Sequence, residues 1–140
     1  MKTKFFFITF GVANLEKSVS FYRDGLGWQT DGIVAEDLHD DNTGADGTIA
    51  FFKFDNGILL ALYERQNLAK DAHIELGSSS ATEFSLGYPA ESKAEVDSIL
   101  EHAKAAGAII TAPPHERPWG IYSGYFKDPD GHLWEVVYRP

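Results

Sequence analysis

The sequence predicts an α+β fold in which a single domain, residues 1–140, is built from two βαβββ modules. In each half of the chain a strand-like segment is followed by an amphipathic helix, and each half ends in two extended segments joined by a tight turn. The halves also match in sequence when Gly57 is aligned with Gly131, which places Ala61 opposite Glu135. A repeat separation of about 75 residues suits two fused modules better than a solenoid.

Composition excludes several classes of protein. Hydrophobic residues make up 44% of the chain and aromatic residues 14%, which is enough to bury a core. The net charge of −9 argues against nucleic acid as the main partner, because phosphate binding draws on clustered Lys and Arg. The absence of Cys excludes disulfides, zinc–thiolate sites and a Cys nucleophile.

The N-terminal segment is basic and then apolar, but its apolar run is too short for a signal peptide and is followed at once by Asn14 and Glu16. We interpret it as the first strand of a cytoplasmic protein. No apolar run in the chain is long enough to span a bilayer, so no membrane association is expected.

The first module is predicted over residues 1–64. A strand at 5–12, buried on both faces, precedes a helix capped by Asn14 and ended near Gly25 and Gly27. The buried stripe of this helix consists of Leu15, Val19, Tyr22 and Leu26. Strands at 28–34, 48–54 and 58–63 follow, with an acidic loop at 35–46 and an Asn-Gly hairpin turn at 55–57.

A linker is predicted at residues 65–81, with a short helix at 67–72. The second module, residues 82–140, starts with a strand at 82–88. Ser92 and Glu95 form a capping box for a helix that ends at Gly107. A short strand at 108–111 and a loop at 112–118 containing three prolines come next.

A final hairpin, residues 119–138, turns at Asp128-Pro129-Asp130-Gly131. Side chains alternate along a strand, so Glu135 points opposite to Trp134. Trp134 is therefore predicted to be core, and Glu135 becomes a carboxylate on an apolar strand face. Such a carboxylate needs a cation, a hydrogen-bond donor or a metal as its partner.

Two segments, 12–27 (VANLEKSVSFYRDGLG) and 125–135 (YFKDPDGHLWE), resemble the vicinal-oxygen-chelate superfamily, which includes glyoxalase I, bleomycin-resistance proteins and extradiol dioxygenases. The resemblance implies a curved open sheet around a cavity, where enzymes of the family hold a divalent metal on up to four strand residues. The matched positions here are Phe7, Ala61, Glu83 and Glu135. Only Glu83 and Glu135 could bind a metal, so we expect no cofactor or a weakly bound divalent metal.

Glu135 is the candidate catalytic residue, and its alternative is a structural carboxylate held by neighbouring donors. The predicted cavity lining is Trp119, Tyr122 and Glu135; Tyr125 joins it only if a bulge forms at Gly124. Aromatic residues on strands are also commonly core. Further ligand-binding candidates are Phe51 and Lys53 on a strand and His115 in the proline loop.

Three functions remain open on sequence alone. The first is a metal-free protein that binds a small organic molecule, with a cationic or neutral aromatic ligand favoured by the acidic balance. The second is a metal-dependent lyase or isomerase, similar to lactoylglutathione lyase, or a dioxygenase-type enzyme. The third is a non-catalytic dimerisation module. In each case we expect a homodimer, because open sheets leave strand edges exposed.

Overall fold

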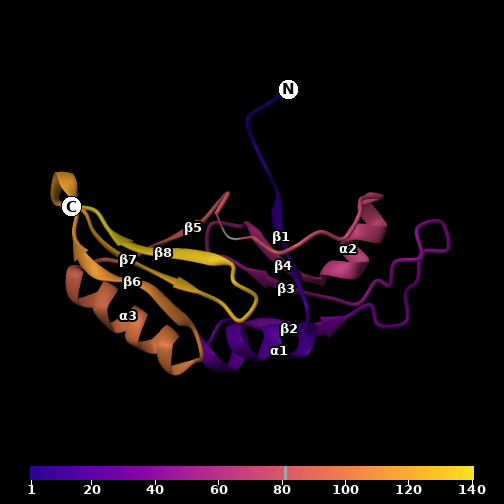
Figure 1. The fold of residues 1–140 in the computed structure, drawn as a ribbon, viewed down its shortest axis with the longest axis horizontal. Coiled ribbons are helices and arrows are strands. Elements are labelled where there is room, and N and C mark those ends of the chain that lie inside the picture. The colour runs from indigo at the N-terminus through magenta and orange to yellow at the C-terminus, as the bar shows by residue number, and fades with distance from the viewer. Residues whose placement is uncertain (81) are drawn as a thin grey trace. The chain divides into compact units, whose positions relative to one another are not determined.

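The computed structural model describes residues 1–80 and 82–140, which form two compact units, Met1–Ser78 and Ser79–Pro140 (Figure 1). Ala81, the last residue of the predicted linker, lies outside the described residues. Each unit contains one four-stranded mixed sheet, and the predicted α+β class is confirmed. Among the described residues, no helix combines the length and apolar character that crossing a bilayer requires.

The first unit follows the predicted β-α-β-β-β order and ends in a helix. Its elements are β1 (Phe7–Val12), α1 (Leu15–Ser20), the π-helical turn η1 (Phe21–Gly25), β2 (Thr30–Val34), β3 (Ile49–Lys53), β4 (Leu59–Glu64) and α2 (Arg65–Ala72). The strand order is β1-β4-β3-β2, with β1 parallel to β4. The helix predicted at 67–72 is present as α2 and begins two residues earlier.

The first helix forms as its sequence predicts. Asn14 Oδ1 accepts a hydrogen bond from the backbone N–H of Lys17 at 2.9 Å, which satisfies one of the orphan donors of the first turn. Val19 and Tyr22 are buried, and the Tyr22 ring lies 5.9 Å from that of Phe52 on β3. One face of the first sheet is therefore closed by α1 and η1.

The prediction that the first strand is buried on both faces is wrong at its start. Phe5 and Phe6 lie outside β1 and are 63% and 67% exposed, and Phe7 is also exposed. The cause is the register of the sheet. Phe7 pairs with Leu59, the first residue of β4, so the residues before Phe7 extend beyond the end of β1's single partner strand.

The second unit repeats this topology. Its elements are β5 (Leu86–Pro89), α3 (Lys93–Ala105), β6 (Ile109–Glu116), the 3₁₀ turn η2 (Pro118–Gly120), β7 (Tyr122–Lys127) and β8 (Leu133–Tyr138). The strand order is β5-β8-β7-β6, with β5 parallel to β8. The predicted capping box is present: Ser92 Oγ accepts from Glu95 N at 3.1 Å, and Glu95 Oε2 accepts from Glu91 N at 3.0 Å.

Two predicted boundaries in this unit are wrong. The strand predicted at 82–88 begins only at Leu86, so Glu83 precedes β5 and is exposed. The predicted proline loop at 112–118 is largely strand, because β6 continues to Glu116 through Pro113 and Pro114. β6 is an edge strand with two register shifts, which is where a sheet tolerates proline and its missing N–H.

The core of the second unit lies between α3 and one face of its sheet (Figure 1). Trp134 is 2% exposed and stacks on Phe126, with ring centroids 6.2 Å apart, which confirms its predicted place in the core. Gly124 lies so close to the helix that a Cβ there would be 2.6 Å from Leu100 Cδ1. The α3 side of the sheet is therefore closely packed, which leaves the opposite face as the place for a ligand site.

Candidate functional site

The candidate site lies on the face of the second sheet opposite α3. Regular antiparallel pairing places Tyr125 beside Glu135 and Lys127 beside Leu133. Because side chains alternate along β8, these residues point away from the face that carries Trp134. All four are half-buried. The structure thus confirms that Glu135 and Trp134 face opposite ways.

Glu135 is held by a hydrogen-bonded chain that starts at Arg117. Ser123, which is 0% exposed, donates from its hydroxyl to Glu135 Oε1 at 2.9 Å. The same hydroxyl oxygen accepts from Arg117 Nε at 2.6 Å, and Arg117 Nη2 lies 3.4 Å from the Ser123 carbonyl oxygen. The predicted need of Glu135 for a partner is met by a hydroxyl donor that is itself linked to a guanidinium.

Tyr125 completes this network. The guanidinium carbon of Arg117 lies 5.5 Å from the centre of the Tyr125 ring, a cation–π arrangement. Burial raises the pKa of the Tyr125 phenol, and the charge of Glu135 and a hydrogen bond with it raise the pKa further, against a smaller lowering by Arg117. The phenol therefore stays protonated at neutral pH and is the donor in its hydrogen bond with the Glu135 carboxylate.

Tyr125 is one of the residues that line an open groove of about 610 Å³, which lies wholly within the second unit. Its lining consists of Thr82, Glu83, Phe84, Ser85, Thr111, Tyr125, Lys127 and Leu133. Thr111 is the extra residue of a β-bulge, because Ile110 pairs with Phe126 while Ala112 pairs with Tyr125. Bulges commonly re-aim side chains near functional sites.

Tyr122 and Trp119 are not brought together with Glu135. β7 has no bulge at Gly124, so Tyr122 and Tyr125 lie on opposite faces. The Tyr122 hydroxyl donates to Asp97 Oδ1 on α3 at 2.7 Å. Trp119 lies in the turn η2 rather than in the hairpin strand, with a φ of 63° and 90% exposure. Tyr125, the less certain candidate, is the aromatic residue beside Glu135.

The remaining ligand-binding candidates lie outside the groove lining. His115 is an exposed residue of β6 that pairs with Ser123 on β7, and its Nδ1 lies 3.0 Å from the carbonyl oxygen of Pro113. Phe51 and Lys53 are exposed residues of β3 in the first unit, on the face opposite Phe52. The groove within the second unit is formed without these three residues.

The four positions matched to family metal ligands do not supply a ligand set in either unit. In the first sheet the buried Ala61 pairs with Thr9, and Phe7 pairs with Leu59. In the second sheet Glu135 pairs with Gly87 on β5, and Glu83 precedes that strand. Of the four positions, only Glu135 is thus a carboxylate on a strand, and its Oε1 is already bonded to Ser123.

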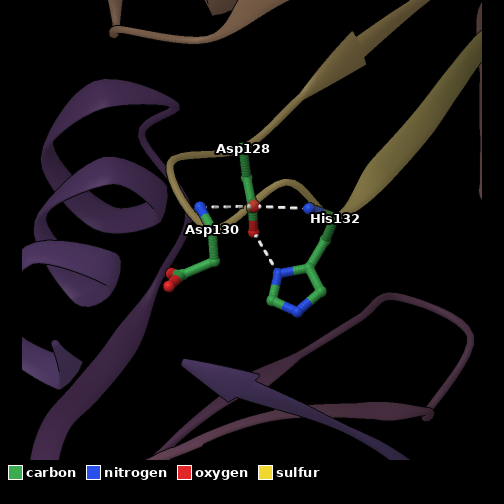
Figure 2. A group of neighbouring side chains, drawn as sticks. All are labelled: Asp128, Asp130 and His132. Atoms are coloured by element: carbon green, nitrogen blue, oxygen red, sulfur yellow. Dashed lines mark hydrogen bonds and ion pairs between the residues drawn. The ribbon is translucent and has the colours of Figure 1, made fainter. Parts of the chain in front are cut away.

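A different group of possible metal ligands, Asp128, Asp130 and His132, lies in the hairpin turn (Figure 2). Asp128 is buried, and its Oδ1 accepts from the backbone N–H groups of Asp130 at 3.0 Å and His132 at 2.8 Å. Its Oδ2 lies 2.8 Å from His132 Nδ1. The sequence predicted this turn, but we did not consider the three residues as a group, although the Asp-x-Asp-x-His spacing is visible.

Sequence analysis also missed Arg117, Ser123, Thr111 and Lys127 as site residues. The alternation of β7 provides a signal for two of them, because Ser123 and Lys127 share the face of Tyr125. Arg117 and Thr111 come from the irregular edge strand β6 and its end, where alternation is broken by register shifts. No periodic pattern could have assigned them.

Comparison with known proteins agrees with the fold. The model of the Glyoxalase/Bleomycin resistance protein/Dioxygenase superfamily matches residues 4–136, and the chain belongs to this superfamily. It is 27% identical over 130 residues to the uncharacterized protein YraH of Bacillus subtilis (strain 168), covering 89% of this chain and 90% of the relative.

Two solved structures extend this similarity. A glyoxalase-related enzyme from Fulvimarina pelagi has a TM-score of 0.80 at 29% identity, covering 99% of this chain and 90% of that one. Lactoylglutathione lyase from Agrobacterium tumefaciens has a TM-score of 0.66 at 25% identity, covering 99% of this chain and 95% of that one.

Proposed function

We propose that this protein binds a small organic molecule in the groove beside Tyr125 and does not use Glu135 to hold a transition metal. The observation that carries the proposal is the chain from Arg117 through Ser123 to Glu135. It joins the carboxylate to a permanent positive charge, and the groove next to it is lined by hydroxyl, aromatic and aliphatic groups together with Lys127 and Glu83. Such a mixture suits an organic ligand.

The alternative is a metal-dependent lyase or isomerase, supported by the similarity to a structure named lactoylglutathione lyase. The residues present do not fit this alternative well. Transition metals in such sites prefer several nitrogen or oxygen ligands converging on one point, whereas Glu135 has Gly87 and Tyr125 as its cross-strand neighbours. The Arg117 guanidinium also opposes a second cation near Ser123 and Glu135 by charge repulsion.

Metal analysis separates these two functions. We expect elemental analysis of natively purified protein to find nickel, zinc and iron far below one equivalent per chain. As a control, Arg117→Met removes the guanidinium and should not weaken any metal binding that depends on Glu135. Near-stoichiometric metal in the wild type, lost in Glu135→Gln, would refute the metal-free proposal.

The binding proposal itself is tested with a neutral aromatic probe. We expect benzamide to shift the backbone amide NMR signals of β7 and the start of β8, with or without EDTA. Tyr125→Ala should weaken this binding because Tyr125 lines the groove. Tyr122→Phe is the matched control, because Tyr122 is on the same strand and faces α3. Equal loss in both variants would refute the assignment of the groove.

We also propose that the protein forms a homodimer. Support comes from the exposed aromatic residues Phe5, Phe6 and Phe7 at the start of the edge strand β1, since exposed strand edges favour pairing. We expect analytical ultracentrifugation at tens of micromolar protein to show a dimer, a concentration at which an interface of standard size is populated. A monomer under these conditions would contradict the proposal.

A further inference from the structure

Lys127 is the basic residue of the groove lining, and none of the described residues forms an ion pair with it. It is half-buried, with Leu133 beside it on β8 and Ile109 beside it on β6. Its ammonium group makes no ion pair or hydrogen bond with the residues that the structure describes. Lys93, by contrast, forms an ion pair with Glu116 on the other side of the sheet.

Hydroxyl groups surround the same groove. Thr82, Ser85, Thr111 and Tyr125 all contribute to its lining, and each can donate a hydrogen bond. The Tyr125 phenol already forms a hydrogen bond with Glu135, so the other three hydroxyl groups are the donors for a ligand. A lysine ammonium together with several hydroxyl donors is a set of groups suited to the oxygens of an anion.

The placement of charges around the groove differs from what the net charge of the chain suggests. The protein carries a net charge of −9, which by itself disfavours anionic ligands. In the lining itself, however, Lys127 carries a positive charge, whereas Arg117 lies outside the lining and is linked through Ser123 to Glu135, which offsets its charge. Glu83 is the carboxylate of the lining and is exposed to solvent, where its charge is screened.

We infer that the ligand of this groove is an organic acid, whose carboxylate, phosphonate or phosphate group pairs with Lys127 while its apolar body contacts Leu133 and Phe84. This inference rests on the proposed function and defines its ligand class. It also reverses the expectation of a cationic or neutral ligand, which followed from net charge alone. The position of each charge, rather than the sum, decides which ligand enters a half-buried groove.

Three probes of nearly the same shape test the inference: benzoate, benzamide and benzamidine, which are anionic, neutral and cationic. Titrations followed by amide NMR give the dissociation constant of each. We expect benzoate to bind about tenfold more tightly than benzamide, as is typical of a charge-assisted hydrogen bond, and benzamidine to bind more weakly than either.

Variants at Lys127 show whether this preference depends on its charge. Lys127→Met should weaken benzoate binding about tenfold, to the level of benzamide, and leave benzamide unchanged. Lys127→Arg should keep the preference for benzoate. Lys104→Met is the matched control, because it removes the same charge from an exposed position of α3.

The outcomes distinguish the two proposals. Equal affinity for benzoate and benzamide in the wild type would overturn the inference of an acidic ligand and leave small-molecule binding in place. The inference of an acidic ligand is also overturned if Lys127→Met still prefers benzoate to benzamide. It is overturned as well if Lys104→Met loses this preference as fully as Lys127→Met does. If none of the three probes shifts the signals of β7 at any soluble concentration, both the inference and the proposed binding groove fail.

Discussion

Trp134→Ala is expected to lower the free energy of unfolding by about 3–5 kcal/mol, the usual cost of removing a large aromatic side chain from a packed core. Trp134 is 2% exposed and stacks on Phe126 at 6.2 Å between ring centroids. The neighbouring Val136 is also fully buried, and α3 covers this face of the sheet. Closely packed neighbours cannot collapse fully into the space that the indole leaves.

Urea denaturation followed by circular dichroism measures this loss, and Glu135→Gln is the matched control. Glu135 is the next residue on the same strand and points to the opposite face. Glutamine can still accept the hydrogen bond from Ser123, so its change in stability should stay within about 0.5 kcal/mol. A stable Trp134→Ala variant combined with an unfolded Glu135→Gln variant would mean that the strand faces are reversed.

Asp128→Ala is expected to have the next largest effect, a loss of about 2–4 kcal/mol. The buried Asp128 carboxylate accepts from the backbone N–H groups of Asp130 and His132 and contacts His132 Nδ1 (Figure 2). Removing it leaves partly buried backbone donors without this partner, which costs more than the hydrogen bonds themselves contribute. The turn that connects β7 and β8 would lose its internal support.

Denaturation of Asp128→Ala is compared with that of Asp55→Ala. Asp55 is an exposed residue within the equivalent turn of the first unit, so its replacement should change stability by less than about 0.5 kcal/mol. Mn²⁺ provides a second measurement. If Mn²⁺ stabilises the wild type but not Asp128→Ala, the group Asp128, Asp130 and His132 is a metal site rather than a structural turn.

The sequence by itself determined the order of the helices and strands, and which side chains of the second hairpin point toward the core. These features depend on local properties. Capping by Asn14 and Ser92 follows from side-chain reach over one helical turn, and the turn at Asp128–Gly131 follows from the φ of +89° that Gly131 adopts easily. The opposite facing of Trp134 and Glu135 follows from the two-residue period of a strand.

Only the tertiary structure decided which side chains gather around Glu135. The absence of a bulge in β7 selected Tyr125 over Tyr122, and the presence of one in β6 placed Thr111 beside the groove. The continuation of β6 past its prolines brought Arg117 to Ser123. Bulges, strand ends and register depend on pairing with neighbouring strands, which the local sequence does not encode. Local sequence can therefore predict which side chains of one strand share a face. Pairing with other strands determines which residues lie next to them on that face.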